Sequence, residues 1–112
     1  MVQTHIFARK FPTLLGEDEL AALELLLAAS PTAGELVPDT GGVRKLRVAA
    51  RSKGKRGGAR VLYFATDDTM PIFLLTIYGK DEKDDVSPAE KAALHQTAKA
   101  ILAAYRRRRG SQ

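Results

Sequence analysis

Polar and apolar residues alternate along residues 43–50 (VRKLRVAA), and this period of two is typical of a β-strand with one buried face. Leu46 and Val48 fall on one face, whereas Lys45 and Arg47 fall on the other. Because the apolar pair must be buried, we expect Lys45 and Arg47 to point away from the core. The pattern therefore predicts a strand that carries cations on its outer face.

Two more strands are predicted downstream. Residues 59–65 (ARVLYFA) form an apolar return strand, and residues 71–80 (PIFLLTIYGK) form a longer one whose nearly continuous apolarity indicates a central position in a sheet. Alternation divides the longer strand into two faces, with one set comprising Phe73, Leu75 and Ile77 and the other comprising Thr76, Tyr78 and Lys80. Between the first two strands, SKGKRGG (52–58) has three glycines and no apolar residue, which predicts a mobile hairpin loop.

Helical patterns precede and follow these strands. Residues 16–30 (GEDELAALELLLAAS) are rich in helix formers, begin with three acids that suit a helix N-terminus and stop before Pro31. We expect the buried face of this helix to hold Leu20, Ala21, Leu23, Leu26 and Leu27. A second helix is predicted after Ser87, because Pro88 and Glu90 complete the pattern of a capping box.

The remaining segments complete the order of elements. Residues 2–7 (VQTHIF) alternate and predict a short opening strand, and residues 31–42 are rich in turn formers and predict a connector. The order of strand, helix, three strands and helix predicts an α+β fold, in which helices pack on one face of an antiparallel meander. A length of 112 residues suits a single domain over residues 1–112.

Composition excludes several classes of site. The chain has no cysteine, which excludes disulfides, thiolate metal sites and a cysteine nucleophile and fits a cytoplasmic protein. Its two histidines are isolated, and we expect the acids of residues 81–85 to stay solvated, so no metal or other cofactor is predicted. No apolar run approaches the roughly 20 residues of a membrane span, and the opening MVQTHIFARKF has no apolar segment typical of a secretory signal.

Charge is concentrated in the predicted hairpin. Residues 43–64 hold eight Lys and Arg and no acid, whereas residues 1–42 and 65–87 each carry a net charge of −4. Residues 88–112 carry +5, and the whole chain carries +5. Such asymmetry indicates a polyanionic partner, most often a nucleic acid, and a merely solvated basic surface is the alternative.

One sheet face gathers the residues that suit such a partner. If helices cover one face of the meander, Lys45, Arg47 and Tyr78 lie on the other, and Arg60 opens the neighbouring strand. The strand pattern leaves the facing of Arg60 open, because residues 61–64 are all apolar or aromatic. Cations neutralise phosphates and an aromatic ring stacks on a base, so this face suits single-stranded RNA.

Three segments resemble a known protein family. They read DTGGVRKLRVA (39–49), SKGKRGGARVLYF (52–64) and PIFLLTIYGKDEKDDVSPAEK (71–91). Together they resemble the HigB-type branch of the RelE/ParE toxin superfamily over about residues 35 to 95. The resemblance implies the toxin of a type II toxin-antitoxin pair, which enters the ribosomal A site and cleaves translated mRNA. It also implies a twisted antiparallel sheet that holds mRNA on the face opposite its helices.

The resemblance implies roles for particular residues. The catalytic positions correspond to Lys45, Arg47, Arg60 and Lys80, and the substrate-binding positions correspond to Lys53, Lys55, Arg56 and Tyr78. A solvated loop is the alternative reading for the three cations between residues 53 and 56. The chain departs from the family pattern at Asp81, where an arginine is frequent, and at residues 86–88, where a tyrosine can follow. Both departures concern the acid-base residues rather than the fold.

The implied chemistry is attack of a ribose 2′-OH on the adjacent phosphate, which gives a cyclic phosphate and a free 5′-OH without a metal. Arg47 and Arg60 suit stabilisation of the phosphorane, because a guanidinium is permanently charged and binds two phosphate oxygens at once. Lys45 is the candidate general base, and Lys55 and Lys80 are expected to bind phosphates. Since the sequence holds no strongly poised acid-base group, we expect poor cleavage of free RNA and reliance on the ribosome.

The resemblance also implies partners. These are the 70S ribosome with its mRNA and a cognate antitoxin, expected to be a helix-turn-helix protein that covers the basic face and binds operator DNA. No membrane contact is expected. Two alternative functions stay open: a ParE-like toxin that inhibits DNA gyrase without nuclease activity, and a non-catalytic nucleic-acid-binding module.

Overall fold

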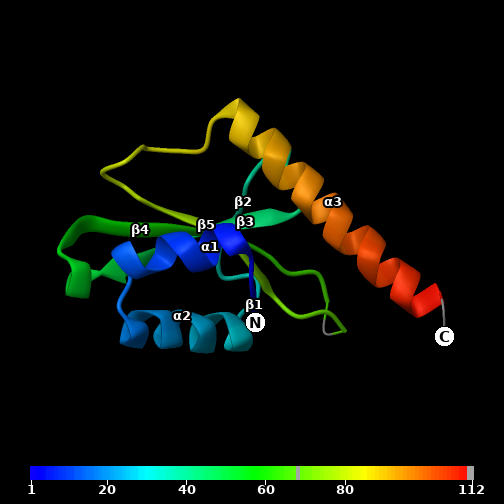
Figure 1. Cartoon of the computed structure of the whole chain (residues 1–112), viewed down its shortest axis with the longest axis horizontal. Coiled ribbons are helices and arrows are strands. Elements are labelled where there is room, and N and C mark those ends of the chain that lie inside the picture. Colours follow the sequence, from blue (N-terminus) through cyan, green and yellow to red (C-terminus); the bar gives the residue numbers. More distant parts are fainter. Residues whose placement is uncertain (68, 111–112) are drawn as a thin grey trace.

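The computed structural model describes residues 1–67 and 69–110, which form a five-stranded mixed sheet with three α-helices (Figure 1). Along the chain the elements are β1 (Val2–Gln3), α1 (His5–Lys10), the 3₁₀ turn η1 (Phe11–Thr13), α2 (Glu17–Ala29), β2 (Glu35–Leu36), β3 (Val43–Ala50), the 3₁₀ turn η2 (Arg51–Lys53), β4 (Lys55–Phe64), β5 (Phe73–Gly79) and α3 (Pro88–Gly110). The strand order is β1-β5-β4-β3-β2. The predicted α+β class is therefore confirmed.

The centre of the sheet is the predicted antiparallel meander of β3, β4 and β5, to which β2 adds at one edge and β1 at the other. The hairpin is longer than predicted, because β4 begins at Lys55, and Lys55 pairs with Ala50 of β3. Much of the segment predicted as a loop is thus strand. Gly58 permits this extension, because its φ is +73° and a Cβ atom there would clash with the carbonyl oxygen of Val48.

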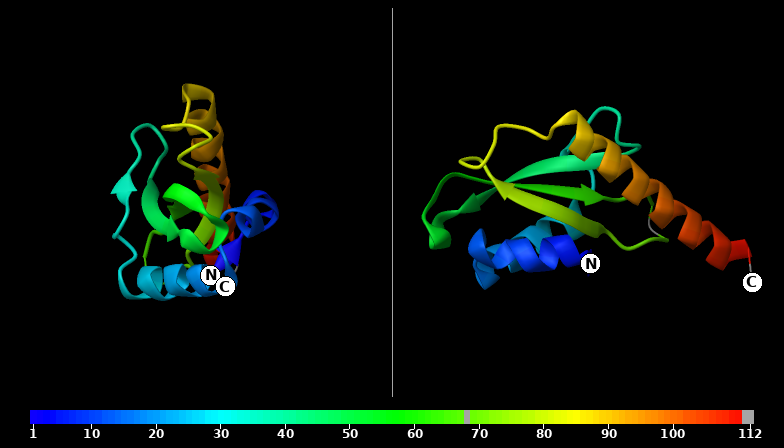
Figure 2. Two further views of the ribbon diagram at one scale, coloured as in Figure 1. Left: turned by 90° about the vertical axis from the view of Figure 1, so that its left-hand side faces the viewer. Right: turned by 45° about the horizontal axis from the view of Figure 1, so that its top comes forward.

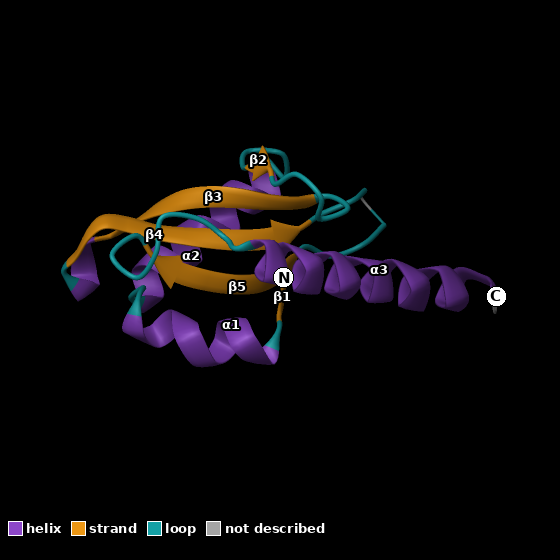
Figure 3. Cartoon of the chain, turned by 90° about the horizontal axis from the view of Figure 1, so that it is seen from above, coloured by secondary structure: helices purple, strands orange, loops and turns teal. Residues whose placement is uncertain are grey.

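Helices cover both faces of the sheet, and this corrects the expectation that they share one. α1 and α2 pack on the face that carries Val61 and Tyr63, whereas Leu94 and Ala98 of α3 pack on the face that carries Leu62 and Phe64 (Figure 2). Seen from above, α1 runs alongside β5, and α2 lies behind the strands (Figure 3). The reason is visible in the sequence, since four consecutive apolar residues on β4 leave neither face fit for water.

A bulge in β5 alters the predicted division of that strand. Leu62 pairs with Thr76 but Tyr63 pairs with Leu74, so Leu75 is an extra residue. As a result Leu75 joins Tyr78 in the cluster under α3, and Ile77 joins the cluster under α1 and α2. The prediction that Phe73, Leu75 and Ile77 share a face was wrong, because a period of two fails across a bulge.

The predicted opening strand is confirmed only for Val2–Gln3, because the rest of the segment turns into helix. The hydroxyl of Thr4 accepts a hydrogen bond from the N–H of Phe7 (3.1 Å) and donates one to the carbonyl of Leu75 (2.6 Å). Thr4 therefore caps α1 and attaches it to the bulge in β5. Phe7 is fully buried in the cluster that α1 shares with α2.

The two longer helices follow the predictions closely. In α2, Leu20, Leu23 and Leu27 are buried, but Ala21 and Leu26 are exposed, so its buried face is narrower than expected. In α3, the hydroxyl of Ser87 accepts from the N–H of Glu90 (3.1 Å) and the Glu90 carboxylate accepts from the N–H of Ser87 (2.9 Å). These two bonds confirm the capping box. None of the described helices is long and apolar enough to cross a membrane.

Two buried tyrosines differ in how their hydroxyl groups are satisfied. The Tyr63 hydroxyl accepts from the N–H of Gly34 (2.9 Å) and donates to the carbonyl of Pro31 (2.7 Å), so it attaches the connector before β2 to the core. The Tyr78 hydroxyl is also buried, but it has no hydrogen-bond partner within residues 1–67 and 69–110. The first hydroxyl therefore stabilises the fold, and the second does not.

This difference predicts unequal effects of two matched substitutions on the free energy of unfolding. Tyr63→Phe leaves a buried N–H and a carbonyl unpaired, and we expect it to lower the free energy of unfolding by about 1–3 kcal/mol. Tyr78→Phe removes a hydroxyl that bonds to nothing in the described chain, and we expect a change near zero or a slight gain. Urea denaturation of both variants measures the difference, and equal losses would contradict it.

Candidate nucleic-acid interface

Three predicted site residues form one row across the meander. Arg47 on β3 lies directly opposite Arg60 on β4, and Arg60 lies directly opposite Tyr78 on β5. In the next row, Lys45 lies opposite Leu62. Directly paired residues share a face, so the register answers what the sequence left open: Arg60 faces the same side as Lys45, Arg47 and Tyr78. We call Arg47, Arg60 and Tyr78 the basic row.

The electrostatics of the basic row favour an anion. Like charges directly opposite each other destabilise an antiparallel pair, so Arg47 and Arg60 oppose folding unless negative charge lies between them. Arg47 is exposed. Arg60 is half-buried, and its guanidinium donates to the carbonyls of Gly57 (2.9 Å) and Ala59 (3.4 Å), which fixes its position at the base of the hairpin. The donors that remain can reach a phosphate.

Two surface hollows meet at Arg47. One, of about 270 Å³, is lined by Lys45, Arg47 and Arg60 together with the acid Glu35. The other, of about 550 Å³, is lined by the cations Arg47, Arg51, Lys55 and Arg56 and by glycine backbone. Together they make a continuous cationic surface from the meander to the tip of the hairpin.

The sequence analysis missed Arg51. It contributes to the hairpin hollow, whereas Lys53, which was predicted, is exposed and does not line it. A signal for Arg51 was present, because a period of two carries the outer face of β3 from Arg47 through Ala49 to Arg51. Lys80 is exposed just after β5, and its aliphatic chain lies so close to Gly57 that a Cβ atom there would be 3.0 Å from the Lys80 Cδ. The structure thus places Lys80 beside the residue whose carbonyl binds Arg60.

Residues 81–87, which we call the covering loop, close over part of the basic row. The Lys83 ammonium lies 4.8 Å from the centre of the Tyr78 ring and forms an ion pair with Glu90 of α3. The Lys45 ammonium donates to the carboxylate of Asp85 (3.1 Å). Only 1% of Tyr78 is exposed as a result. Asp85 stays exposed to solvent, as expected for the acids of this loop, but it also pairs with Lys45.

The contacts of the covering loop shift several pKa values. Burial raises the pKa of Tyr78, and the negative charge of Asp85 adds to the effect. The Val86 N–H (2.8 Å) and then Lys45 lower the pKa of Asp85. Lys83 and then the N–H of Ser87 lower the pKa of Glu90. These contacts favour the anionic forms of Asp85 and Glu90 and the neutral form of Tyr78.

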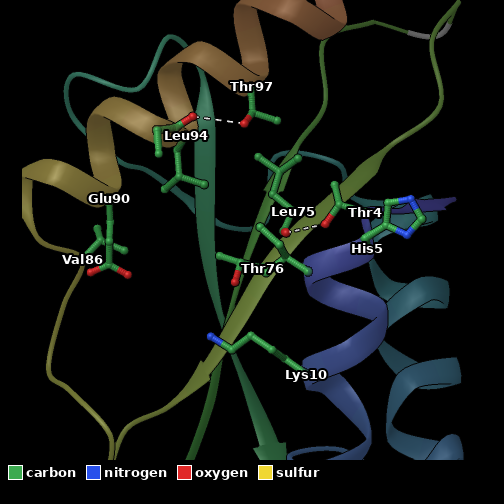
Figure 4. Close-up of a pocket in the computed structure, with 11 residues that line it drawn as sticks. Thr4, His5, Lys10, Leu75, Thr76, Val86, Glu90, Leu94 and Thr97 are labelled. Atoms are coloured by element: carbon green, nitrogen blue, oxygen red, sulfur yellow. Dashed lines mark hydrogen bonds between the residues drawn. The ribbon is translucent and has the colours of Figure 1, made fainter.

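A separate and mainly apolar pocket of about 470 Å³ lies between α1 and α3 above β5 (Figure 4). Its lining includes Ile6, Leu75, Leu94 and Thr76, and the side chain of Lys10 reaches towards it. None of the eight predicted site residues lines it. Within the described ranges, no group of three or more His, Asp and Glu side chains is placed to hold a metal ion.

Comparison with known protein families identifies the family of this chain. Residues 4–108 match the family described as the RelE toxin of the RelE / RelB toxin-antitoxin system. The match includes the whole meander, the covering loop and most of α3.

The ion pair between Asp85 and Lys45 predicts a specific sensitivity to acid. A carboxyl group whose pKa is lowered by folding stabilises the fold above the unfolded pKa of about 4, and this contribution is lost as the pH falls through the folded pKa. We expect Asp85→Asn to reduce the drop in the free energy of unfolding between about pH 5 and pH 2. Urea denaturation across this range measures it. Asp84→Asn removes the same charge from an exposed position and should leave the drop close to that of the wild type; equal effects would exclude a specific contact.

Proposed function

Because the chain belongs to the RelE family of toxins from toxin-antitoxin systems, we propose that it is a ribosome-dependent endoribonuclease that cleaves mRNA in the ribosomal A site. The observation that best supports this proposal is the basic row, in which Arg47, Arg60 and Tyr78 occupy one register across three strands. Neighbouring strands lie about 5 Å apart, so the two guanidinium groups can reach the same phosphate. The motifs of β3, the hairpin and β5 favour the HigB-type branch of the superfamily, and we propose that residues 1–112 act as one domain.

The proposed reaction uses a nucleophile that belongs to the substrate. The ribose 2′ oxygen loses its proton and attacks the adjacent phosphorus, the bond from phosphorus to the 5′ oxygen breaks, and the 5′ oxygen takes up a proton. The products are a 2′,3′-cyclic phosphate and a 5′-hydroxyl. Arg47 and Arg60 stabilise the charge that develops on the phosphorane, and Tyr78 stacks on or bonds to the neighbouring nucleotide.

Lys45 is the proposed general base, and its contact with Asp85 sets a condition for that role. Only a neutral amine can accept a proton, so Lys45 acts as a base only after it leaves Asp85 and releases its own proton to solvent. Lys80 and Lys55 bind flanking phosphates. The leaving oxygen takes its proton from solvent, and the ribosome supplies much of the ordering of the substrate.

The proposed partners follow from the same surface. A toxin of this family has a cognate antitoxin. We propose that the antitoxin, a helix-turn-helix protein, covers the basic surface and carries all contact with operator DNA. Lys53, Lys55, Arg56 and Arg51 at the hairpin tip are proposed to contact RNA phosphates on the ribosome.

Arg60→Ala tests whether the basic row carries the activity. Removing a positioned donor to a developing oxyanion lowers a rate by about 100-fold or more, so we expect ribosome-dependent cleavage to fall by that factor. Arg9→Ala is the matched control, because Arg9 is exposed on α1, outside the basic row, and its loss changes the net charge equally. Tightly controlled expression, growth curves and mapping of mRNA 5′ ends measure the outcome.

The same experiment separates the alternative functions. Growth arrest with new in-frame cuts in translated messages, lost in Arg60→Ala but kept in Arg9→Ala, supports the endoribonuclease. Arrest with intact messages and gyrase-dependent DNA damage would instead indicate a ParE-like toxin. RNA affinity that declines gradually with each removed cation, without cleavage, would indicate a binding module.

A modified message tests the reaction itself. On programmed ribosomes, we expect 2′-deoxy substitution at the nucleotide 5′ to the scissile phosphate to abolish cleavage while the toxin still binds, because the nucleophile is missing. The same substitution one nucleotide further upstream should leave cleavage intact. Electrophoresis and end-group analysis of the products measure both, with a 5′-hydroxyl and a cyclic phosphate expected. Cleavage of the first message would exclude attack by the 2′ oxygen.

A further inference from the structure

We propose that the covering loop, residues 81–87, is a lid on the basic row, and that the Asp85 carboxylate occupies on Lys45 the place that an RNA phosphate takes when the lid opens. The inference rests on the proposed function, because it assumes that the basic row binds RNA. Beyond that function, we infer that the loop is closed in this structure and that the substrate must displace it.

Three attachments hold the lid closed. Asp85 bonds to Lys45 (3.1 Å), Lys83 lies over the Tyr78 ring and pairs with Glu90, and the side chain of Val86 is buried against the cluster under α3. The Asp85 side chain is 60% exposed, and ion pairs so close to water contribute little to stability. Where the lid leaves β5, Glu82 also bonds to Gly79, with the Gly79 N–H donating to the Glu82 carboxylate (3.1 Å). Farther along, the lid depends on weak electrostatic contacts and one apolar anchor, which is typical of segments that open locally.

The burial of Tyr78 makes the closed state less favourable in free energy. Its ring is 1% exposed, and its hydroxyl has no hydrogen-bond partner among the residues that the structure describes. A buried hydroxyl without a partner is unfavourable, and opening the lid would let it bond to water or to RNA. Arg47 is exposed while Tyr78 is covered, so RNA can reach one end of the basic row but not the other until the lid moves.

The negative charge of RNA allows a phosphate to replace the Asp85 carboxylate on Lys45. A phosphate and a carboxylate both accept hydrogen bonds from an ammonium group, so RNA competes directly with Asp85 for Lys45. The lid also carries Asp81, Glu82 and Asp84, and an approaching phosphate chain repels all of these acids. Binding of a polyanion therefore removes the contact with Lys45 and pushes the lid away from the basic row.

The test compares Asp85→Asn with Asp84→Asn, which remove one charge each from the same loop. The probe is a short single-stranded RNA with 2′-O-methyl groups throughout, so that binding is measured without cleavage, by fluorescence anisotropy at fixed salt. Only Asp85→Asn removes the competitor of the phosphate, so we expect it to bind about two- to fivefold more tightly than Asp84→Asn. In a Lys45→Met background the two variants should bind equally. Equal affinities with Lys45 present would overturn the proposal.

Hydrogen exchange observes the lid directly. We expect the amides of residues 81–87 to exchange faster in the wild type when the probe is bound, and also in Asp85→Asn without the probe. The exchange of the β4 amides should stay unchanged in both cases. Failure of the probe to bind, or binding without faster exchange in the loop, would overturn the lid. A lid that opens with the probe in a protein that cuts no message on the ribosome would refute only the proposed endoribonuclease, so the two failures are distinguishable.

Discussion

The burial of β4 on both faces is the constraint on which the structure depends. Val61 to Phe64 are four consecutive apolar residues, and each face of the strand needs its own cover. α1 and α2 cover one face, and α3 covers the other together with Val86 of the covering loop, in a cluster that reaches Tyr78. Arg60 and Arg47 continue the row of Tyr78 outside this cluster, and the tip of the hairpin lies beyond both clusters. The cationic surface therefore lies where the second apolar cluster ends.

Much of the fold could be predicted from the sequence, because its local signals agree with the tertiary contacts. The alternation in β3, the leucines of α2 and the capping box of Ser87 and Glu90 all gave correct elements. Two of the failures share one cause, which is that a distant residue decides the local conformation. Thr4 ends the first strand because it bonds to Leu75, 71 positions away, and the bulge in β5 is invisible in a run of apolar letters. Cover on both faces could have been predicted from β4, whose apolar run does not alternate.

The candidate site was predictable to the same extent. The facing of Lys45 and Arg47 followed from alternation, whereas that of Arg60 required the register of three strands. The closure of residues 81–87 had no sequence signal, because acids in a loop are usually solvated and the partner of Asp85 lies 40 positions away. The opposed arginines illustrate a general conflict: the arrangement that suits a phosphate is unfavourable for the empty protein.

The Glu90 carboxylate has two partners, and this links the start of α3 to the basic row. One partner is the N–H of Ser87, which belongs to the helix cap, and the other is the ammonium of Lys83. If the loop moves, Glu90 can keep its bond to the Ser87 N–H and lose Lys83. Alternatively, Glu90 can stay paired with Lys83, and the first turn of α3 then loses its cap and frays. The loop therefore has a hinge made from a helix terminus. A molecule that binds the outer surface of α3 would therefore change how far the loop covers the basic row, without contacting any cation of that row.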